Sequence, residues 1–211
     1  KTIRIVDEMF LLNPKYYIPL CEKLSKLNKN DELKMWAYSR VDTLRRKNIL
    51  SLVRSAGIKW LCLGIESGDK KIRLEVSKGK FEDVDIDKVV NQVHESGIEI
   101  MANYIYGLPG DAKDTINETF KLSKKLNTLG WNTYAAMALP GSALYKEALE
   151  KNYKLPEKYE DFSFHSYNTQ PLPTDSLDPA EILKLRDNHY FEYHTNKKFL
   201  DKIKSKFGEK A

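Results

Sequence analysis

The chain repeats one unit: a helical stretch with one apolar face, then a glycine, then a short apolar stretch. Gly57, Gly97 and Gly130 each follow a helical stretch, so successive glycines are 40 and 33 residues apart. Glycine commonly ends a helix because it adopts the left-handed backbone conformation without strain. The short apolar stretches that follow are typical of buried strands. The sequence therefore predicts helices and strands in regular alternation, with Asp85 and Asp111 as candidate caps at the start of the second and third helices.

This alternation predicts five strands, at residues 3–6, 35–38, 60–65, 98–106 and 133–139. Strands separated by helices pair in parallel, because each crossover returns the chain to the same edge of the sheet. A β/α barrel and a doubly wound sheet both fit this pattern. No Gly-x-Gly-x-x-Gly follows the first strand, which disfavours dinucleotide binding. We expect an α/β fold, a partial parallel (β/α) barrel with about five of six β/α units and a C-terminal helical extension.

Composition shifts after residue 152. We expect residues 1–152 to form the partial barrel, and residues 153–211 to form an extension rich in aromatic residues and proline that ends in helix. In the extension, Asp178 can cap a helix with Glu181 reaching back to it. The aromatic residues between 153 and 167 either fill the core under a crossing loop or form a lid, and His165 is the residue of interest if they form a lid.

Charge and cysteine content narrow the class of protein. The net charge of +5 comes from 35 basic and 30 acidic residues scattered along the chain, so nucleic acid is not indicated. No apolar run approaches the roughly 20 residues of a membrane helix, so no membrane partner is expected. Cys21 and Cys62 are the only cysteines, and no secretory signal precedes them. They are interpreted as reduced, buried thiols of a cytoplasmic protein.

Polar residues gather where the predicted strands end, and in either architecture these ends form the functional edge. In chain order they are Asp7, Glu8, Ser39, Arg40, Glu66 and Ser67, followed by residues 106–110 and 139–142. Several carboxylates and an arginine facing one cavity are costly to bury without partners or a ligand. This favours a site for a polar small molecule. The alternative is that Asp7, Arg40 and Glu66 form a structural ion network.

Three of these segments together resemble the radical S-adenosylmethionine superfamily. They are residues 64–68 (Gly-Ile-Glu-Ser-Gly), 106–110 (Tyr-Gly-Leu-Pro-Gly) and 139–142 (Leu-Pro-Gly-Ser). The resemblance is closest to the cobalamin-binding branch, which also fits residues 7–10 and 173–181. It implies S-adenosylmethionine, a four-iron four-sulfur cluster that cleaves its sulfonium reductively, and radical chemistry. Cobalamin-dependent methyl transfer or another radical reaction is the implied activity of the parent protein.

One element of the resembled family is missing from these 211 residues. The family binds its cluster with a Cys-x-x-x-Cys-x-x-Cys loop, whereas Cys21 and Cys62 are 41 positions apart. The resemblance thus implies a fragment that starts after the cluster loop, a hypothesis in keeping with Lys1 opening directly into a strand pattern. Upstream segments of the same protein would supply the cluster and, in this branch, cobalamin. Alone, the fragment is expected to be inactive, with no metal ligands of its own.

The resemblance also implies roles for nine residues in binding S-adenosylmethionine: Asp7, Glu8, Ser39, Arg40, Glu66, Ser67, Tyr106, Gly107 and Pro109. Asp7 and Glu8 would face its methionine end, and Arg40 would meet the carboxylate. Glu66 would accept hydrogen bonds from the ribose hydroxyls, and the turn at Gly107 would approach the adenine. Two departures weaken the adenine part of the match. Asn103 stands where the family often has glycine, and Asp111 follows Gly110 where the family usually has glutamate.

Other interpretations stay open. The chain can be a self-contained barrel enzyme of lyase or aldolase type, with Glu66 as base and the Gly107 turn holding a phosphate or carboxylate. No predicted strand ends in a lysine, which disfavours Schiff-base chemistry. It can also be a nucleoside-binding fragment without activity. The stretch from His94 to Gly97 matches only part of the cobalamin signature Asp-x-His-x-x-Gly and is interpreted as structural. The sequence identifies no substrate.

Overall fold

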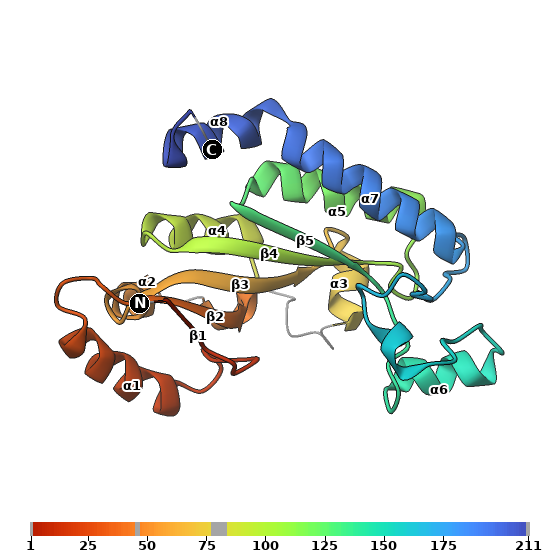
Figure 1. Cartoon of the computed structure of the whole chain (residues 1–211), viewed down its shortest axis with the longest axis horizontal. Coiled ribbons are helices and arrows are strands. Elements are labelled where there is room, and N and C mark those ends of the chain that lie inside the picture. Colours follow the sequence, from red (N-terminus) through yellow and green to blue (C-terminus); the bar gives the residue numbers. More distant parts are fainter. Residues whose placement is uncertain (1, 45–46, 77–83, 210–211) are drawn as a thin grey trace. The chain divides into compact units, whose positions relative to one another are not determined.

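The computed structural model describes residues 2–44, 47–76 and 84–209, so Lys1 lies outside the described residues. Five strands alternate with helices along the chain (Figure 1). The strands are β1 (Thr2–Arg4), β2 (Lys34–Arg40), β3 (Ile58–Glu66), β4 (Glu99–Tyr106) and β5 (Gly130–Ala135). The helices are α1 (Pro14–Leu27), α2 (Lys47–Ser55), α3 (Lys70–Val76), α4 (Ile86–Glu95), α5 (Lys113–Leu126), α6 (Ala143–Glu150), α7 (Pro179–Thr195) and α8 (Lys197–Phe207), with short 3-10 helices η1 (Val41–Leu44) and η2 (Tyr159–Phe162).

The strands form one sheet in the order β1-β2-β3-β4-β5. The pairs β1 with β2 and β2 with β3 are parallel, with Ile3 opposite Met35 and Tyr38 opposite Cys62. Spatial order equals chain order, as in a β/α barrel, whereas a doubly wound sheet reverses its order at a switch point. The predicted fold class, a partial parallel (β/α) barrel with a helical C-terminal extension, is confirmed.

The chain divides into two compact units that interleave along the sequence. Unit 1 comprises the described parts of Lys1–Ile65, Ser77–Asn103 and Leu126–Trp131, and unit 2 those of Glu66–Val76, Tyr104–Lys125 and Asn132–Ala211. The carboxyl ends of β1 and β2 therefore belong to unit 1, and those of β3, β4 and β5 belong to unit 2. The boundary expected between residues 152 and 153 stays a prediction.

Unit 1 shows the helix ends that the sequence predicts. Asp85 caps α4 by accepting a hydrogen bond from the backbone N–H of Lys88, and three valines of that helix are buried. Gly57 has a φ of +106°, and a Cβ there would lie 2.8 Å from the Cβ of Leu33. Helix α1 begins at Pro14. Proline suits this position because its missing N–H has no partner in the first turn of a helix.

One core cluster of unit 2 joins the ends of β4 and β5 to α5 and α7. This cluster consists of Tyr106, Ile116, Ala135, Leu177 and Ile182. Helix α7 opens with the predicted capping box, in which Asp178 and Glu181 exchange hydrogen bonds between side chain and backbone. Its inward face buries Ile182, His189 and Tyr193. The extension is thereby attached to the strand ends of its own unit.

Two expectations about β5 are wrong. The strand ends at Ala135 rather than residue 139. Just beyond it, the backbone N–H of Leu172 donates to the carbonyl of Ala136, and the chain then leaves the sheet. Helix α5 ends at Leu126, and Asn127 beyond it has the positive φ of 46°. Gly130 instead begins β5, where any Cβ would collide with the side chain of Met101.

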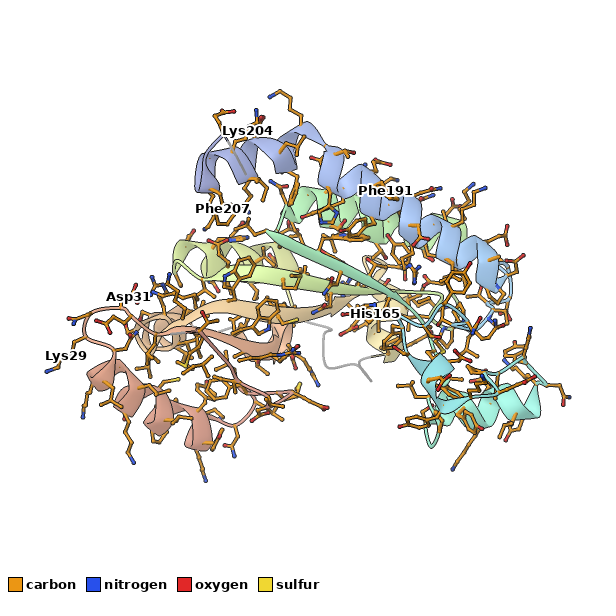
Figure 2. The ribbon with its side chains drawn as sticks, in the orientation of Figure 1. Lys29, Asp31, His165, Phe191, Lys204 and Phe207 are labelled. Atoms are coloured by element: carbon orange, nitrogen blue, oxygen red, sulfur yellow. The ribbon has the colours of Figure 1, made fainter. Side chains whose placement is uncertain are left out.

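The aromatic part of the extension is packed at one residue and exposed at others. Phe164 packs on Tyr134 with ring centroids 5.0 Å apart, whereas Tyr159 and Tyr167 are exposed. His165 is also exposed and lies on the surface of unit 2, with its ring 6.4 Å from that of Tyr134 (Figure 2).

Among the helices of the described ranges, none has both the length and the apolar character needed to span a bilayer.

Candidate functional site

The nine residues predicted to bind a ligand divide between the two units. Unit 1 holds four of them, Asp7, Glu8, Ser39 and Arg40, and unit 2 holds the other five, Glu66, Ser67, Tyr106, Gly107 and Pro109. All nine lie at or just after the carboxyl ends of β1 to β4.

Asp7 and Glu8 follow β1 on the surface of unit 1. The Oδ1 atom of Asp7 accepts a hydrogen bond of 2.9 Å from the backbone N–H of Met9, which forms a local turn. Glu8 borders an open cleft with Arg4, Val6 and Tyr38. Arg4 donates a hydrogen bond to the hydroxyl of Tyr38 and lies over its ring. This cleft therefore offers a ligand one exposed carboxylate and one aromatic edge.

Ser39 and Arg40 end β2 and are bound by the residues that follow them. The hydroxyls of Ser39 and Thr43 are 2.7 Å apart, and Ser39 is buried. The guanidinium of Arg40 binds both carboxylate oxygens of Asp42, with Nε to Oδ1 at 2.9 Å and Nη2 to Oδ2 at 2.5 Å. Asp42 is not among the residues predicted from the sequence. A carboxylate two residues after a strand-end arginine is the signal that could have found it.

Glu66 ends β3 with a φ of +67°, one of four non-glycine residues with positive φ in the described ranges. This region is unfavourable for a side chain larger than glycine, and such residues often lie at functional sites. Glu66 is partly buried, while Ser67 after it is fully buried. The backbone changes direction at Glu66. The side chain of Glu66 lies at the end of β3, whereas Ser67 enters the core of the unit.

Residues 67 and 68 are fixed against α5 and α3. The backbone N–H of Gly68 donates to the hydroxyl of Thr119 at 2.8 Å, and the hydroxyls of Ser67 and Thr119 are 3.2 Å apart. Arg73 donates from Nη1 to the carbonyl of Ser67 at 2.7 Å. Gly68 is required by this packing, because a Cβ would lie 2.6 Å from the Cα of Thr119. Burial lowers the pKa of Arg73 below its usual range.

Gly107 and Pro109 belong to a tight turn that Asp111 closes. The Oδ2 atom of Asp111 accepts hydrogen bonds from the backbone N–H groups of Gly107 at 3.0 Å and Leu108 at 3.1 Å. Its Oδ1 accepts from the hydroxyl of Thr115 at 2.6 Å. Asp111 is only 2% exposed, and this burial raises its pKa even though the hydrogen bonds oppose the shift.

The sequence-based role of Asp111 as the cap of α5 is therefore wrong. The helix begins two residues later, at Lys113, and the carboxylate turns back toward the strand end. The backbone N–H of Ala112 is bound instead by the hydroxyl of Thr115. An aspartate before a helix can satisfy either set of donors, so its position in the sequence does not decide between them.

Tyr106 places its phenol in the core of unit 2. Its hydroxyl is 2.8 Å from Nδ1 of His189, and burial raises its pKa. His189 in turn stacks on Phe120 with ring centroids 3.9 Å apart, and burial lowers its pKa. Contact between Tyr106 and a cofactor stays a prediction, and the phenol already has a partner in α7.

The turn also lines a small pocket within unit 2. Gly107, Pro109 and Gly110 form one side of this pocket, which has a volume of about 70 Å³. The other sides come from α6, from Tyr153 and from residues 172–175. Both Glu147 and Lys151 border it and form an ion pair of 2.6 Å with each other. The backbone of the glycine turn is thus accessible from one side.

The two cysteines do not fit an iron–sulfur cluster. Cys21 is buried in α1, and burial raises its pKa to about 11. Cys62 is buried in β3, where its Sγ accepts a hydrogen bond of 2.8 Å from the side chain of Asn103. A cluster needs several thiolates close together. In the part of the chain that the structure describes, no three His, Cys, Asp or Glu residues are grouped to hold a metal ion.

Comparison with known proteins identifies similar sequences and similar structures. No protein-family model matches the sequence. The chain is 28% identical over 202 residues to the anaerobic magnesium-protoporphyrin IX monomethyl ester cyclase of Rubrivivax gelatinosus, covering 93% of this chain and 34% of that protein. Its structure resembles the radical S-adenosylmethionine methyltransferase TsrM from Kitasatospora setae, solved with cobalamin and a [4Fe-4S] cluster bound. That match has a TM-score of 0.62 and 19% identity, and covers 71% of this chain and 30% of TsrM.

A second solved structure is also similar. Coproporphyrinogen III oxidase (HemN) from Escherichia coli, a radical SAM enzyme, matches with a TM-score of 0.56 and 16% identity over 92% of this chain and 43% of HemN. The chain has the fold of radical S-adenosylmethionine enzymes. The resemblance to this superfamily, predicted from the strand-end motifs, is confirmed, and TsrM with its bound cobalamin is among the similar structures. The chain spans about a third of the length of the first two curated relatives, 34% and 31%.

Proposed function

We propose that the chain contributes the S-adenosylmethionine-binding strand ends of a radical S-adenosylmethionine enzyme of the cobalamin-linked branch. Cobalamin-dependent methyl transfer, or another radical reaction, is the proposed activity of the whole protein. The fold supports this proposal, as does the likeness to a methyltransferase that binds cobalamin and a [4Fe-4S] cluster. The substrate stays open, because substrates are chosen by parts of the barrel and of the whole protein beyond these strand ends.

The backbone of Glu66 is the observation that carries the proposal. A non-glycine residue in the left-handed region costs roughly 1–3 kcal/mol and persists only where its surroundings impose it. Here the surroundings do so, because Ser67 and Gly68 are bound to Thr119. Glu66 therefore presents its carboxylate at the end of β3 from a left-handed backbone conformation that its bound neighbours maintain. In the proposal this carboxylate accepts hydrogen bonds from the two ribose hydroxyls.

The glycine turn complements Glu66 within unit 2. The absence of side chains at Gly107 and Gly110 permits close approach of a flat ring to the backbone, which suits the adenine. The bonds from Asp111 keep the turn in one shape before a ligand arrives. Pre-ordering of this kind reduces the entropy lost on binding.

The methionine end of the ligand is assigned to residues of unit 1. Arg40 is the group for its carboxylate, since a guanidinium offers two parallel donors. Asp42 already holds that guanidinium, so in the proposal Asp42 orients Arg40 and shares it with the ligand. Ser39, Asp7 and Glu8 are assigned to the same end. When bound, S-adenosylmethionine supplies a sulfonium whose carbon–sulfur bonds can be broken.

The iron–sulfur cluster is assigned to residues outside these 211, since Cys21 and Cys62 do not fit it. The chain by itself is therefore proposed to bind the nucleoside and to generate no radical. The cobalamin signature also lacks a fit, because Gln92 stands at its aspartate position and His94 lies near the end of α4. No role in cobalamin binding is assigned to this stretch.

Titration calorimetry tests the proposal. The 211-residue chain is titrated with S-adenosylmethionine and with S-adenosylhomocysteine, which lacks the sulfonium charge. Replacing Glu66 by glutamine removes the charged acceptor and keeps the size, so we expect affinity to fall about tenfold or more. Glu118→Gln, an exposed position on α5, is the matched control and should bind as the wild type does. Failure of the wild type to bind either ligand, or equal affinity in the Glu66 variant, contradicts the proposal.

A further inference from the structure

Helix α7 contacts the glycine turn and the strand end before it. At Gly107, a Cβ would lie 2.8 Å from Cδ1 of Ile182, so the helix packs directly on the turn. One residue earlier, the hydroxyl of Tyr106 is 2.8 Å from Nδ1 of His189. Beyond the turn, Ser176, three residues before the helix, donates to the carbonyl of Asp111 at 3.4 Å. The extension thus contacts the first residue of the turn and the residues that flank the turn on either side.

His189 is itself held in one orientation. Its ring stacks on Phe120 with an interplanar angle of 3° and meets the ring of Tyr106 edge-on at 89°. It is only 7% exposed. Burying an imidazole and a phenol among apolar side chains is costly unless they bind each other, and here they do. Their hydrogen bond therefore fixes the end of β4 relative to α7.

We infer that His189 is a positioning residue for the nucleoside site, acting through the Tyr106 hydroxyl to fix the turn from Gly107 to Gly110. This inference rests on the proposed function for its ligand. In this inference Tyr106 supports the turn from the core of the unit and does not contact the cofactor. It also gives the extension a function, since His189 is 83 residues from Tyr106 in sequence and connects α7 to the strand end.

Amide hydrogen exchange tests the positioning without any ligand. The backbone N–H groups of Gly107 and Leu108 both donate to Asp111, so their exchange rates report how often the turn opens. His189→Phe keeps a ring to stack on Phe120 and removes the hydrogen bond. We expect these two amides to exchange about tenfold faster in this variant, relative to amides of α4 as an internal reference.

Two further variants separate positioning from general loss of packing. His189→Asn restores an amide group near the place of Nδ1 and should return the two exchange rates toward the wild-type values. His194→Phe makes the same chemical change on α7, where the histidine binds the carbonyl of Tyr190 instead, and should leave both amides unchanged. Unchanged exchange in His189→Phe, or no recovery in His189→Asn, overturns the inference.

Affinity for S-adenosylhomocysteine, measured on the same variants, links the turn to the ligand. We expect His189→Phe to bind about tenfold more weakly and His189→Asn to recover most of the affinity. If the wild type binds and the exchange rates change while affinity does not, the inference is overturned. If the wild type does not bind, the proposed function fails, and the exchange rates alone decide whether His189 positions the turn.

Discussion

The two groups of strand-end residues are held in different ways. In unit 1, Arg40 and Ser39 are bound by Asp42 and Thr43, which lie two and four residues further along. In unit 2, the turn after β3 is bound by a threonine 52 residues away in sequence, and the end of β4 by a histidine 83 residues away. Local contacts can form and break with little effect on the rest of a domain, whereas contacts between distant segments require the packed core. The nucleoside end of the proposed site is therefore the rigid one.

Gly68 should show the largest effect. A Cβ at this position meets the backbone of Thr119, which cannot move aside as a flexible side chain can. We expect Gly68→Ala to lower the free energy of unfolding by about 3 kcal/mol, measured by denaturant titration. Gly110→Ala is the control, because its added Cβ meets nothing within 4 Å and only its φ of +83° is unfavourable. The control should lose about 1 kcal/mol. Equal losses would mean that the close approach to α5 is not what fixes the turn.

Asp111 should come next. Replacing it by alanine leaves the buried N–H groups of Gly107 and Leu108 and the hydroxyl of Thr115 without their acceptor. Unpaired buried groups cost about 1–3 kcal/mol, so we expect a loss of about 2 kcal/mol in Asp111→Ala by the same titration. Asp114→Ala, in the first turn of the same helix, serves as the control. A loss no greater than in the control would show that the turn keeps its shape without Asp111.

These two positions show what the sequence could and could not predict. The alternation of helices and strands, the caps at Asp85 and Asp178, and the positive φ of Gly57 follow from local patterns, and each was predicted. Strand ends as the place for polar residues follow from parallel topology, so the predicted site residues lie there. Asp111 closes the turn through a local contact, but an aspartate before a helix can also cap that helix, so the sequence does not decide between the two. The functions of Thr119 and His189 depend instead on which distant segments meet in space. A single sequence carries no local signal for such contacts.

The pH dependence of stability offers a finer test of the buried turn. Burial raises the pKa of Asp111 above the value of about 3.9 that an unfolded aspartate has. A raised pKa means that the folded state binds the proton more tightly. The stability that this carboxyl contributes is therefore complete below about pH 3.9 and is lost as the pH rises through the folded-state pKa.

Asp111→Asn makes this dependence measurable, since an amide does not titrate and can still accept from the turn. We expect the wild type to lose stability relative to this variant as the pH rises from about 4 through the folded-state pKa. Unfolding titrations of both proteins across that range provide the measurement. A difference that stays constant with pH, or that grows in favour of the wild type, would mean that the hydrogen bonds to Asp111 outweigh its burial.

Asp42 should show the smallest effect on stability, and this sharpens the contrast between the units. Its ion pair with Arg40 is bidentate, but both side chains keep contact with water, with 23% and 17% of their surfaces exposed. Such pairs contribute about 0.5–1 kcal/mol and are screened by salt, so we expect Asp42→Asn to lose no more than this, and less in concentrated salt. Thermal unfolding at two salt concentrations measures it, with Glu118→Gln, which removes an exposed pair, as the reference near zero. A loss as large as that of Asp111→Ala would mean that the strand-end residues of unit 1 are held as firmly as those of unit 2. A small loss of stability combined with weaker binding of S-adenosylmethionine would instead mean that Asp42 serves to orient Arg40 for the ligand.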